Sequence, residues 1–329
     1  MISIGAAPPI TLALAGDTML GRGVAERLAA GRAAPLLDPA VVEAATRADL
    51  FVVNLECCIS ARGERFPDPD KPFFIRAPPP AADWLAAVGV DCATLANNHA
   101  LDYGPVALLD TLEHLALAGV AAVGGGASPE AARAPVVLES GGIRLRVVAA
   151  TDHPAAYAAA RGSPGVAFAP LRRSGRLPDW LRDALAPGPD ADLVLAAVHW
   201  GPNMVGAPVA AVRAAAPALL AAGADLVAGH SAHVFHGAAG AVLYDLGDFL
   251  DDYRVDRDLR NDLGLLWFVT LDAGGPRHVE ALPLALDYCH TRPAMGGERD
   301  LVERLLAERC AAVGSRVERH GDRLAVVGG

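Results

Sequence analysis

The stretch ITLALAGD at residues 10–17 carries the pattern that decides the fold. Ile10–Ala15 is apolar at every position, and the run ends at Gly16 and Asp17. A short run that is apolar throughout is typical of a strand buried on both faces. Further runs of this kind lie at Leu50–Leu55, Cys92–Ala96, Leu145–Ala150, Leu193–Val198, Leu226–Ala228, Ala241–Leu246 and Leu265–Leu271.

Helical patterns rich in alanine and leucine separate these runs. They lie at Gly21–Ala30, Pro39–Arg47, Ala81–Val88, Pro105–Ala118, Leu177–Ala186, Val209–Ala222 and Leu301–Ala312. Several carry proline near the expected first turn, which favours a helix N-terminus. The repeated alternation of strand and helix predicts an α/β protein in which the sheet is sandwiched between layers.

Seven of the apolar runs lead into aspartate, glutamate, asparagine or histidine. In an open α/β sheet the carboxyl ends of the strands share one rim, where ligands bind. Carboxylate, amide carbonyl and imidazole groups all suit a divalent transition metal. The sequence therefore predicts a mixed nitrogen and oxygen site for two ions, formed by Asp17, Glu56, Asn98, His199, His230 and His233.

Each of these residues has a structural alternative. Asp17 could cap the helix expected from Gly21, because a short acidic side chain is a common N-cap. His99, beside Asn98, could likewise cap a helix or hydrogen-bond within its own loop. The pair His230 and His233 favours metal binding, because two imidazoles three residues apart behind a glycine and an apolar strand rarely serve packing.

The bulk composition excludes several classes of protein. The chain has 329 residues and a net charge of −10, and no run rich in lysine or arginine, so nucleic acid is an improbable partner. The five cysteines form no CxxC pair, which indicates neither a disulfide framework nor a zinc ribbon. Ser231 lacks a surrounding G-x-S-x-G, which disfavours a serine hydrolase. No uncharged apolar stretch reaches about 18 residues, so we expect a cytoplasmic protein without stable membrane insertion.

The ordered motifs resemble those of the CapA family, whose members are associated with bacterial poly-γ-glutamate capsule synthesis and are related to calcineurin-like metallophosphoesterases. The resemblance runs from about residue 10 to residue 285. It implies a four-layer α/β/β/α sandwich of the metallophosphoesterase type with a dinuclear metal site. The motifs are Gly16-Asp17-Thr18-Met19, Asn54-Leu55-Glu56, Asn97-Asn98-His99 with Asp102 and Gly104, His199-Trp200-Gly201, Gly229-His230-Ser231-Ala232-His233 and Tyr244-Asp245-Leu246-Gly247-Asp248-Phe249.

The resemblance implies a role for each residue of the rim. Glu56 would stand where a carboxylate bridges the two metals, and Asp17 and His233 would hold the first metal. Three side chains would hold the second metal, namely Asn98, His199 and His230. The predicted catalytic residues are His99, as the acid that protonates a leaving group, and Asp248, which adds a carboxylate to the rim.

The chain departs from the wider superfamily at the first metal position. Metallophosphoesterases usually begin with D-x-H, whereas Thr18-Met19 follows Asp17 here, so His153 or Asp152 could be recruited instead. Asp248 stands where asparagine is usual. We expect a catalytic domain over residues 1–290 and a C-terminal helical extension, 291–329, packed on it.

The predicted function is hydrolysis of an activated ester, thioester or phosphoester of a small molecule by metal-bound hydroxide. The expected cofactors are two divalent or mixed-valence transition metals, iron, manganese or zinc. The acidic stretch 244–262 favours a substrate with little charge, because it would repel a dianion. The alternatives are a role in poly-γ-glutamate capsule synthesis or processing and a non-catalytic metal-binding module. No oligomeric state is predicted.

Overall fold

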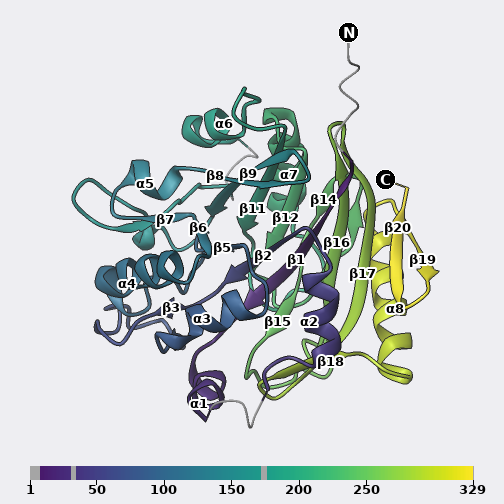
Figure 1. Cartoon of the computed structure of the whole chain (residues 1–329), viewed down its shortest axis with the longest axis horizontal. Helices are drawn as coiled ribbons and strands as arrows, with labels where there is room; N and C mark the ends of the chain where they lie inside the picture. The colour runs from purple at the N-terminus through teal and green to yellow at the C-terminus, as the bar shows by residue number, and fades with distance from the viewer. Residues whose placement is uncertain (1–7, 31–34, 172–175, 329) are drawn as a thin grey trace.

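Two main sheets form the framework of this mixed α/β protein (Figure 1). The structure, a computed structural model, describes residues 8–30, 35–171 and 176–328. In order, the larger sheet contains β19 (Arg316–His320), β20 (Arg323–Val327), β17 (Gly275–Asp287), β16 (Leu263–Asp272), β1 (Ile10–Thr18), β2 (Leu50–Leu55), β5 (Cys92–Thr94) and β6 (Ala121–Val123). Beside this path, β15 (Asp248–Leu250) pairs with β1 and β18 (His290–Pro293) pairs with β17.

The smaller sheet has six strands. Their order is β13 (Ala238–Ala239), β14 (Val242–Leu243), β12 (Leu226–His230), β11 (Leu193–His199), β9 (Ile143–Thr151) and β8 (Val136–Ser140). Two further pairs are short, β3 (Cys58–Ile59) with β4 (Arg76–Ala77) and β7 (Gly125–Gly126) with β10 (Gly165–Val166). The strands that precede the predicted site residues are parallel within each sheet: β1, β2 and β5 in the larger, and β9, β11 and β12 in the smaller.

The alternation of side chains along the strands explains why both faces are apolar. On β1, Leu12 and Leu14 face a core shared by the two sheets, whereas Ala13 and Ala15 face the core beneath the helices of the larger sheet. Side chains along β11 alternate in the same way between the shared core and a third core. A strand buried on both faces needs apolar residues at every position. The prediction of doubly buried strands is therefore confirmed, although two sheets stand where the strand pattern alone suggested one.

Helices cover the outer faces of the two sheets. The first core packs α1 (Arg22–Ala30), α2 (Pro39–Thr46), α3 (Pro80–Ala87) and α4 (Gly104–Leu117) against the larger sheet. The third core packs α6 (Asp179–Leu185) and α7 (Ala210–Ala222) against the smaller sheet. The short α5 (Pro129–Arg133) and the 3-10 turn η2 (Ala155–Tyr157) lie between the two groups in sequence. No helix among the described residues is both long enough and apolar enough to cross a bilayer.

The C-terminal segment differs from the helical extension expected there. Helix α8 (Gly297–Ala311) begins four residues earlier than predicted, and the hairpin of β19 and β20 then extends the larger sheet beyond β17 (Figure 1). Strand β19 is mostly exposed and carries charged residues, so it lacks the apolar signal of a buried strand. The domain boundary at residue 290 stays a prediction.

Candidate metal centre

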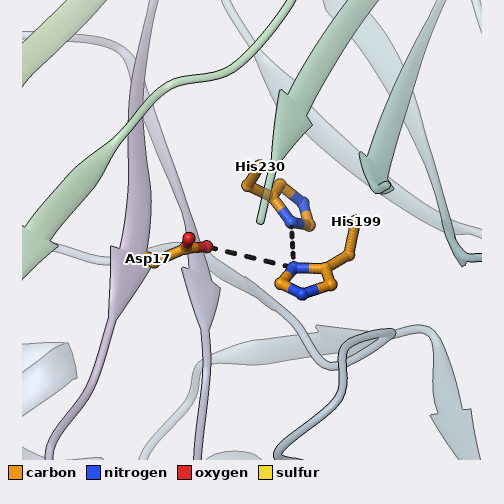
Figure 2. Close-up of side chains that lie close together, drawn as sticks. All are labelled: Asp17, His199 and His230. Atoms are coloured by element: carbon orange, nitrogen blue, oxygen red, sulfur yellow. Dashed lines mark hydrogen bonds and ion pairs between the residues drawn. The ribbon is translucent and has the colours of Figure 1, made fainter. Parts of the chain in front are cut away.

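The carboxyl ends of strands from both sheets bring the predicted ligands together. Asp17 is the next-to-last residue of β1, Glu56 follows β2 directly, and His199 and His230 are the last residues of β11 and β12. His199 and His230 are also paired in register across these parallel strands. Figure 2 shows the Asp17 carboxylate of one sheet facing the two imidazoles of the other. The expected rim therefore spans two sheets rather than one.

Two overlapping groups of ligand atoms occupy this rim. In the first, the His199 Nδ1 atom lies 4.0 Å from an Asp17 oxygen and 2.9 Å from the His230 Nδ1 atom. In the second, the His233 Nδ1 atom lies 3.3 Å from an Asp17 oxygen and 3.9 Å from a Glu56 oxygen. The other Glu56 oxygen is 3.9 Å from the His199 Nε2 atom. Glu56 thus faces both groups, as a bridging carboxylate would.

Unpaired polar atoms show that these side chains fit a bound cation. Both oxygens of Glu56, Oδ1 of Asn98 and the Nε2 atoms of His199 and His230 are buried without a hydrogen-bond partner among the described residues. A buried polar group without a partner costs about 1–3 kcal/mol, and a charged one more. Imidazole nitrogens and carboxylate or amide oxygens are metal ligands, so a divalent ion would satisfy all of these atoms at once.

The pKa values reflect an excess of buried negative charge. Burial, reinforced by Asp17, raises the pKa of Glu56 well above its ordinary value. Burial would lower the pKa of His233, but Asp248 and Glu56 raise it well above the usual histidine range. By contrast, burial lowers the pKa of His230 to about 4. His230 is therefore neutral at pH 7, the state in which imidazole binds a metal.

A strained turn presents His233 to the centre. Ser231 has φ 122° and His233 has φ 58°, both in the left-handed region that residues other than glycine rarely adopt. Two buried carboxylates hold this turn: Asp17 accepts from the Ser231 amide at 3.2 Å, and Asp245 accepts from the Ala232 amide at 2.9 Å. Strain maintained in this way is characteristic of functional sites.

A second network orients His99. The His99 Nδ1 atom lies 2.6 Å from an Asp102 oxygen, which leaves Nε2 facing Glu56 at 3.9 Å. The Lys71 ammonium lies 3.1 Å from Asp102 and donates to the Asn98 carbonyl oxygen at 2.7 Å, and the Tyr157 hydroxyl also donates to Asp102. Burial lowers the pKa of His99, although Asp102 opposes this effect. Nε2 is therefore the ring nitrogen of His99 that faces the centre.

A cavity of about 440 Å³ opens beside the ligands. Asn98, His99 and His233 line its inner end. Lys71 and Phe73 also line it, and both belong to the proline-rich segment 67–80. The part of this segment that precedes β4 therefore forms one wall of the cavity.

Comparison with known proteins assigns the family. The family model described as bacterial capsule synthesis protein PGA_cap matches residues 11–253. The chain belongs to the PGA_cap family. This finding confirms the resemblance to CapA proteins, and the matched span contains every predicted site residue.

Relatives in this family carry related names. A probable polyglutamine synthesis accessory protein of Mycobacterium tuberculosis is 32% identical over 297 residues, covering 85% of this chain and 77% of that protein. The capsule biosynthesis protein CapA of Bacillus anthracis is 26% identical over 300 residues, covering 86% and 69%. A solved structure, a hypothetical protein from Thermus thermophilus, aligns with a TM-score of 0.42 at 20% identity over 87% of this chain and 96% of that one.

The remaining predicted residues of this PGA_cap protein also lie at the centre. Asp248 is fully buried, and its Oδ1 atom lies 2.8 Å from the His233 Nδ1 atom. The rings of His153 and His199 have centroids 5.2 Å apart, while Asp152 accepts from the Gly201 amide. Asp17 does not cap α1, where the Gly23 amide donates to Asp252 instead.

Lys71 and the partnership of Asp102 with His99 were missed by the sequence reasoning. The spacing His99-x-x-Asp102 was a usable signal, because residues three apart in a turn can hydrogen-bond. Lys71 carried no such signal, since it lies 28 residues before His99 in a segment without periodicity. Both residues fall within the family match.

The metal-free PGA_cap protein is expected to lose stability as pH rises from 7 to 8. Burial and then Asp17 raise the pKa of Asp245 to about 8, so the folded state retains a proton that the unfolded state has already lost. A raised folded-state pKa makes stability fall with pH, by about 1.4 kcal/mol per pH unit for each such carboxyl. His230 does not offset this loss of stability, because above pH 7 it is neutral in both the folded and the unfolded state. Urea unfolding of the chelated protein measures the effect; a stability that stays constant or rises over this range contradicts it.

Proposed function

We propose that this chain is a metal-dependent hydrolase with an accessory role in polyglutamate synthesis or processing. The observation that carries the proposal is the buried rim, where ligand atoms of Glu56, His199 and His230 lack partners among the described residues beside an open cavity. Family membership and the names of the relatives, which refer to capsule and polyglutamine synthesis, support the polymer over an unrelated small molecule.

We also propose that the fold is a four-layer α/β/β/α sandwich of the metallophosphoesterase type. The shared core between the two sheets and the helix-covered cores on their outer faces support this description. In such an arrangement the carboxyl ends of parallel strands from both sheets meet at one edge, which is where the candidate ligands lie.

Different residues at the centre would bind the metals and transfer the proton. Asp17, Glu56 and His233 would hold one ion, and Asn98, His199 and His230 the other. A bound pair of this kind supplies a Lewis acid and lowers the pKa of water at the site. His99 would move a proton at its Nε2 atom, because Asp102 fixes the other ring nitrogen. For an amide of polyglutamate, water adds to the carbonyl carbon, the C–N bond breaks, and the departing amine takes up a proton.

The cavity mouth suits the end of an anionic chain. Arg254 and Asn203 line it with exposed side chains. The acidic stretch behind it is less repulsive than its sequence suggests, because Asp262 pairs with Arg260. Asp252 is likewise neutralised by an ion pair with Arg22. This local pairing lowers the negative charge near the cavity, although Asp68 and Asp70 also line it.

A small, weakly charged ester or thioester is the second candidate substrate. The apolar lining of the cavity favours it, because Pro72, Phe73, Met204 and Tyr253 provide a surface for an uncharged group. The same residues and the same nucleophile would serve attack on a carbonyl or a phosphoryl group.

A panel of substrates tests the proposed function. Protein supplied with Mn²⁺ or Fe²⁺ is incubated with poly-γ-glutamate oligomers, γ-glutamyl peptides, phosphomonoesters, phosphodiesters and acyl thioesters. Metal-dependent release of glutamate or shortened oligomers is the expected result, and chelation should abolish it. Hydrolysis confined to phosphoesters or thioesters would assign the second candidate instead. Bound metal without turnover of any substrate would contradict hydrolysis and leave a metal-binding module.

A further inference from the structure

The position nearest His233 contains more carboxylates than its imidazole can satisfy. The His233 Nδ1 atom lies 2.8 Å from Asp248, 3.3 Å from Asp17 and 3.9 Å from Glu56. One N–H group can donate to only one of these acceptors well. Three buried carboxyl groups therefore surround a single imidazole donor.

Asp248 is fixed in this position by the backbone. Strand β15 pairs with β1 in parallel, and Asp248 lies opposite Asp17 in the register. The side chain is fully buried, its Oδ2 atom accepts no hydrogen bond from a described donor, and the buried carboxyl of Asp251 is a further neighbour. If Asp248 served only to hold His233, it would need one oxygen, and the second would remain desolvated at a cost.

The residue two positions after Asp17 does not contribute to the centre. Met19 stands there, and its side chain is buried in the apolar core beneath the helices of the larger sheet. It therefore contributes no ligand. The neighbouring strand β15 brings the Asp248 carboxyl next to Asp17 instead.

We propose that Asp248 is a metal ligand that completes an oxygen-rich position with Asp17, Glu56 and His233. This inference rests on the proposed metal centre and replaces the catalytic role expected for Asp248. It makes the two positions chemically unequal, because the other one is dominated by the nitrogens of His199 and His230. Carboxylate-rich sites suit Mn²⁺ or Mg²⁺, whereas imidazole-rich sites suit Zn²⁺ or Fe²⁺. The centre is then built for two different metals.

Titration of the metal-free protein with Mn²⁺, and separately with Zn²⁺, tests the inference by counting bound equivalents. Asp248→Asn preserves shape and an acceptor for His233 but removes the charge. We expect it to weaken the tighter Mn²⁺ equivalent by roughly 100-fold, at or above the effect of removing an outer-sphere partner. The variant should still bind its tight Zn²⁺ equivalent, and this binding would show that it is folded. The matched control is Asp252→Asn, which removes a charge from the same segment and should leave both equivalents unchanged.

The outcomes separate this inference from the proposed function. Wild-type Mn²⁺ affinity in Asp248→Asn overturns the ligand role and leaves the metal centre intact. Failure of the wild-type protein to bind either ion removes the metal centre itself and the inference with it. If Asp248→Asn does not fold, a wild-type crystal soaked in Mn²⁺ shows whether Asp248 contacts the ion. An anomalous peak in contact with Asp248 supports the role, and a peak away from it overturns the role.

Discussion

Alanine at His199 is expected to remove one metal equivalent and to lower metal-dependent hydrolysis by about 100-fold or more. The physical reason is its central place, since one ring nitrogen faces Asp17 at 4.0 Å and the other faces Glu56 at 3.9 Å. The variant should remain folded, because alanine removes a buried imidazole whose Nε2 atom has no hydrogen-bond partner among the described residues. Elemental analysis measures the bound metal, circular dichroism measures folding, and the substrate panel measures the rate of hydrolysis.

His114→Ala is the matched control for this experiment. His114 lies in α4 away from the centre, and its removal should change neither metal content nor rate. Retention of both metals and full activity by His199→Ala would contradict the assignment of His199 as a ligand. Loss of activity in both variants would point to general destabilisation instead.

Glutamine at Glu56 is expected to have opposite effects on metal binding and on stability. Both Glu56 oxygens are buried without partners among the described residues, and burial together with Asp17 raises the pKa of the carboxyl well above its ordinary value. Glutamine is buried without first taking up a proton, so the metal-free variant should be more stable at pH 7 by about 1–3 kcal/mol. The same change removes a carboxylate that faces both groups of ligand atoms, and it should weaken both metals by about 100-fold or more.

The gain in stability of Glu56→Gln should grow with pH. A carboxyl with a raised folded-state pKa lowers the free energy of unfolding as pH rises. Its replacement therefore stabilises the metal-free protein more at pH 8 than at pH 6. Urea unfolding of the chelated wild-type and variant proteins at the two pH values measures the difference. A metal-free variant less stable than wild type at both pH values would contradict the account. Such a trade of stability for binding is common at functional sites.

Much of the rim was accessible from sequence because of one geometric rule. Parallel strands end at the same edge, so polar residues that directly follow apolar runs must lie close together. That rule brought Asp17, Glu56, His199 and His230 together without any knowledge of the sheet order. Their roles as metal ligands remain predictions.

The features that sequence did not reveal depend on tertiary contacts. An apolar run does not say which sheet it joins, so the strand pattern alone did not predict the division into two sheets. Lys71 reaches Asp102 only because the segment 67–80 folds back over the rim. Strand β17 carries exposed charges at one end and Pro283 within it, and both weaken its pattern. Asp248 meets His233 through the pairing of β15 with β1, which no local pattern encodes.

The metal content of the purified wild-type protein, followed by activity after exhaustive chelation, tests the central claim most directly. The account predicts up to two transition-metal equivalents per chain, loss of hydrolysis when they are removed, and recovery when Mn²⁺ or Fe²⁺ is returned. A protein that binds no metal and hydrolyses its substrate fully after chelation would contradict it.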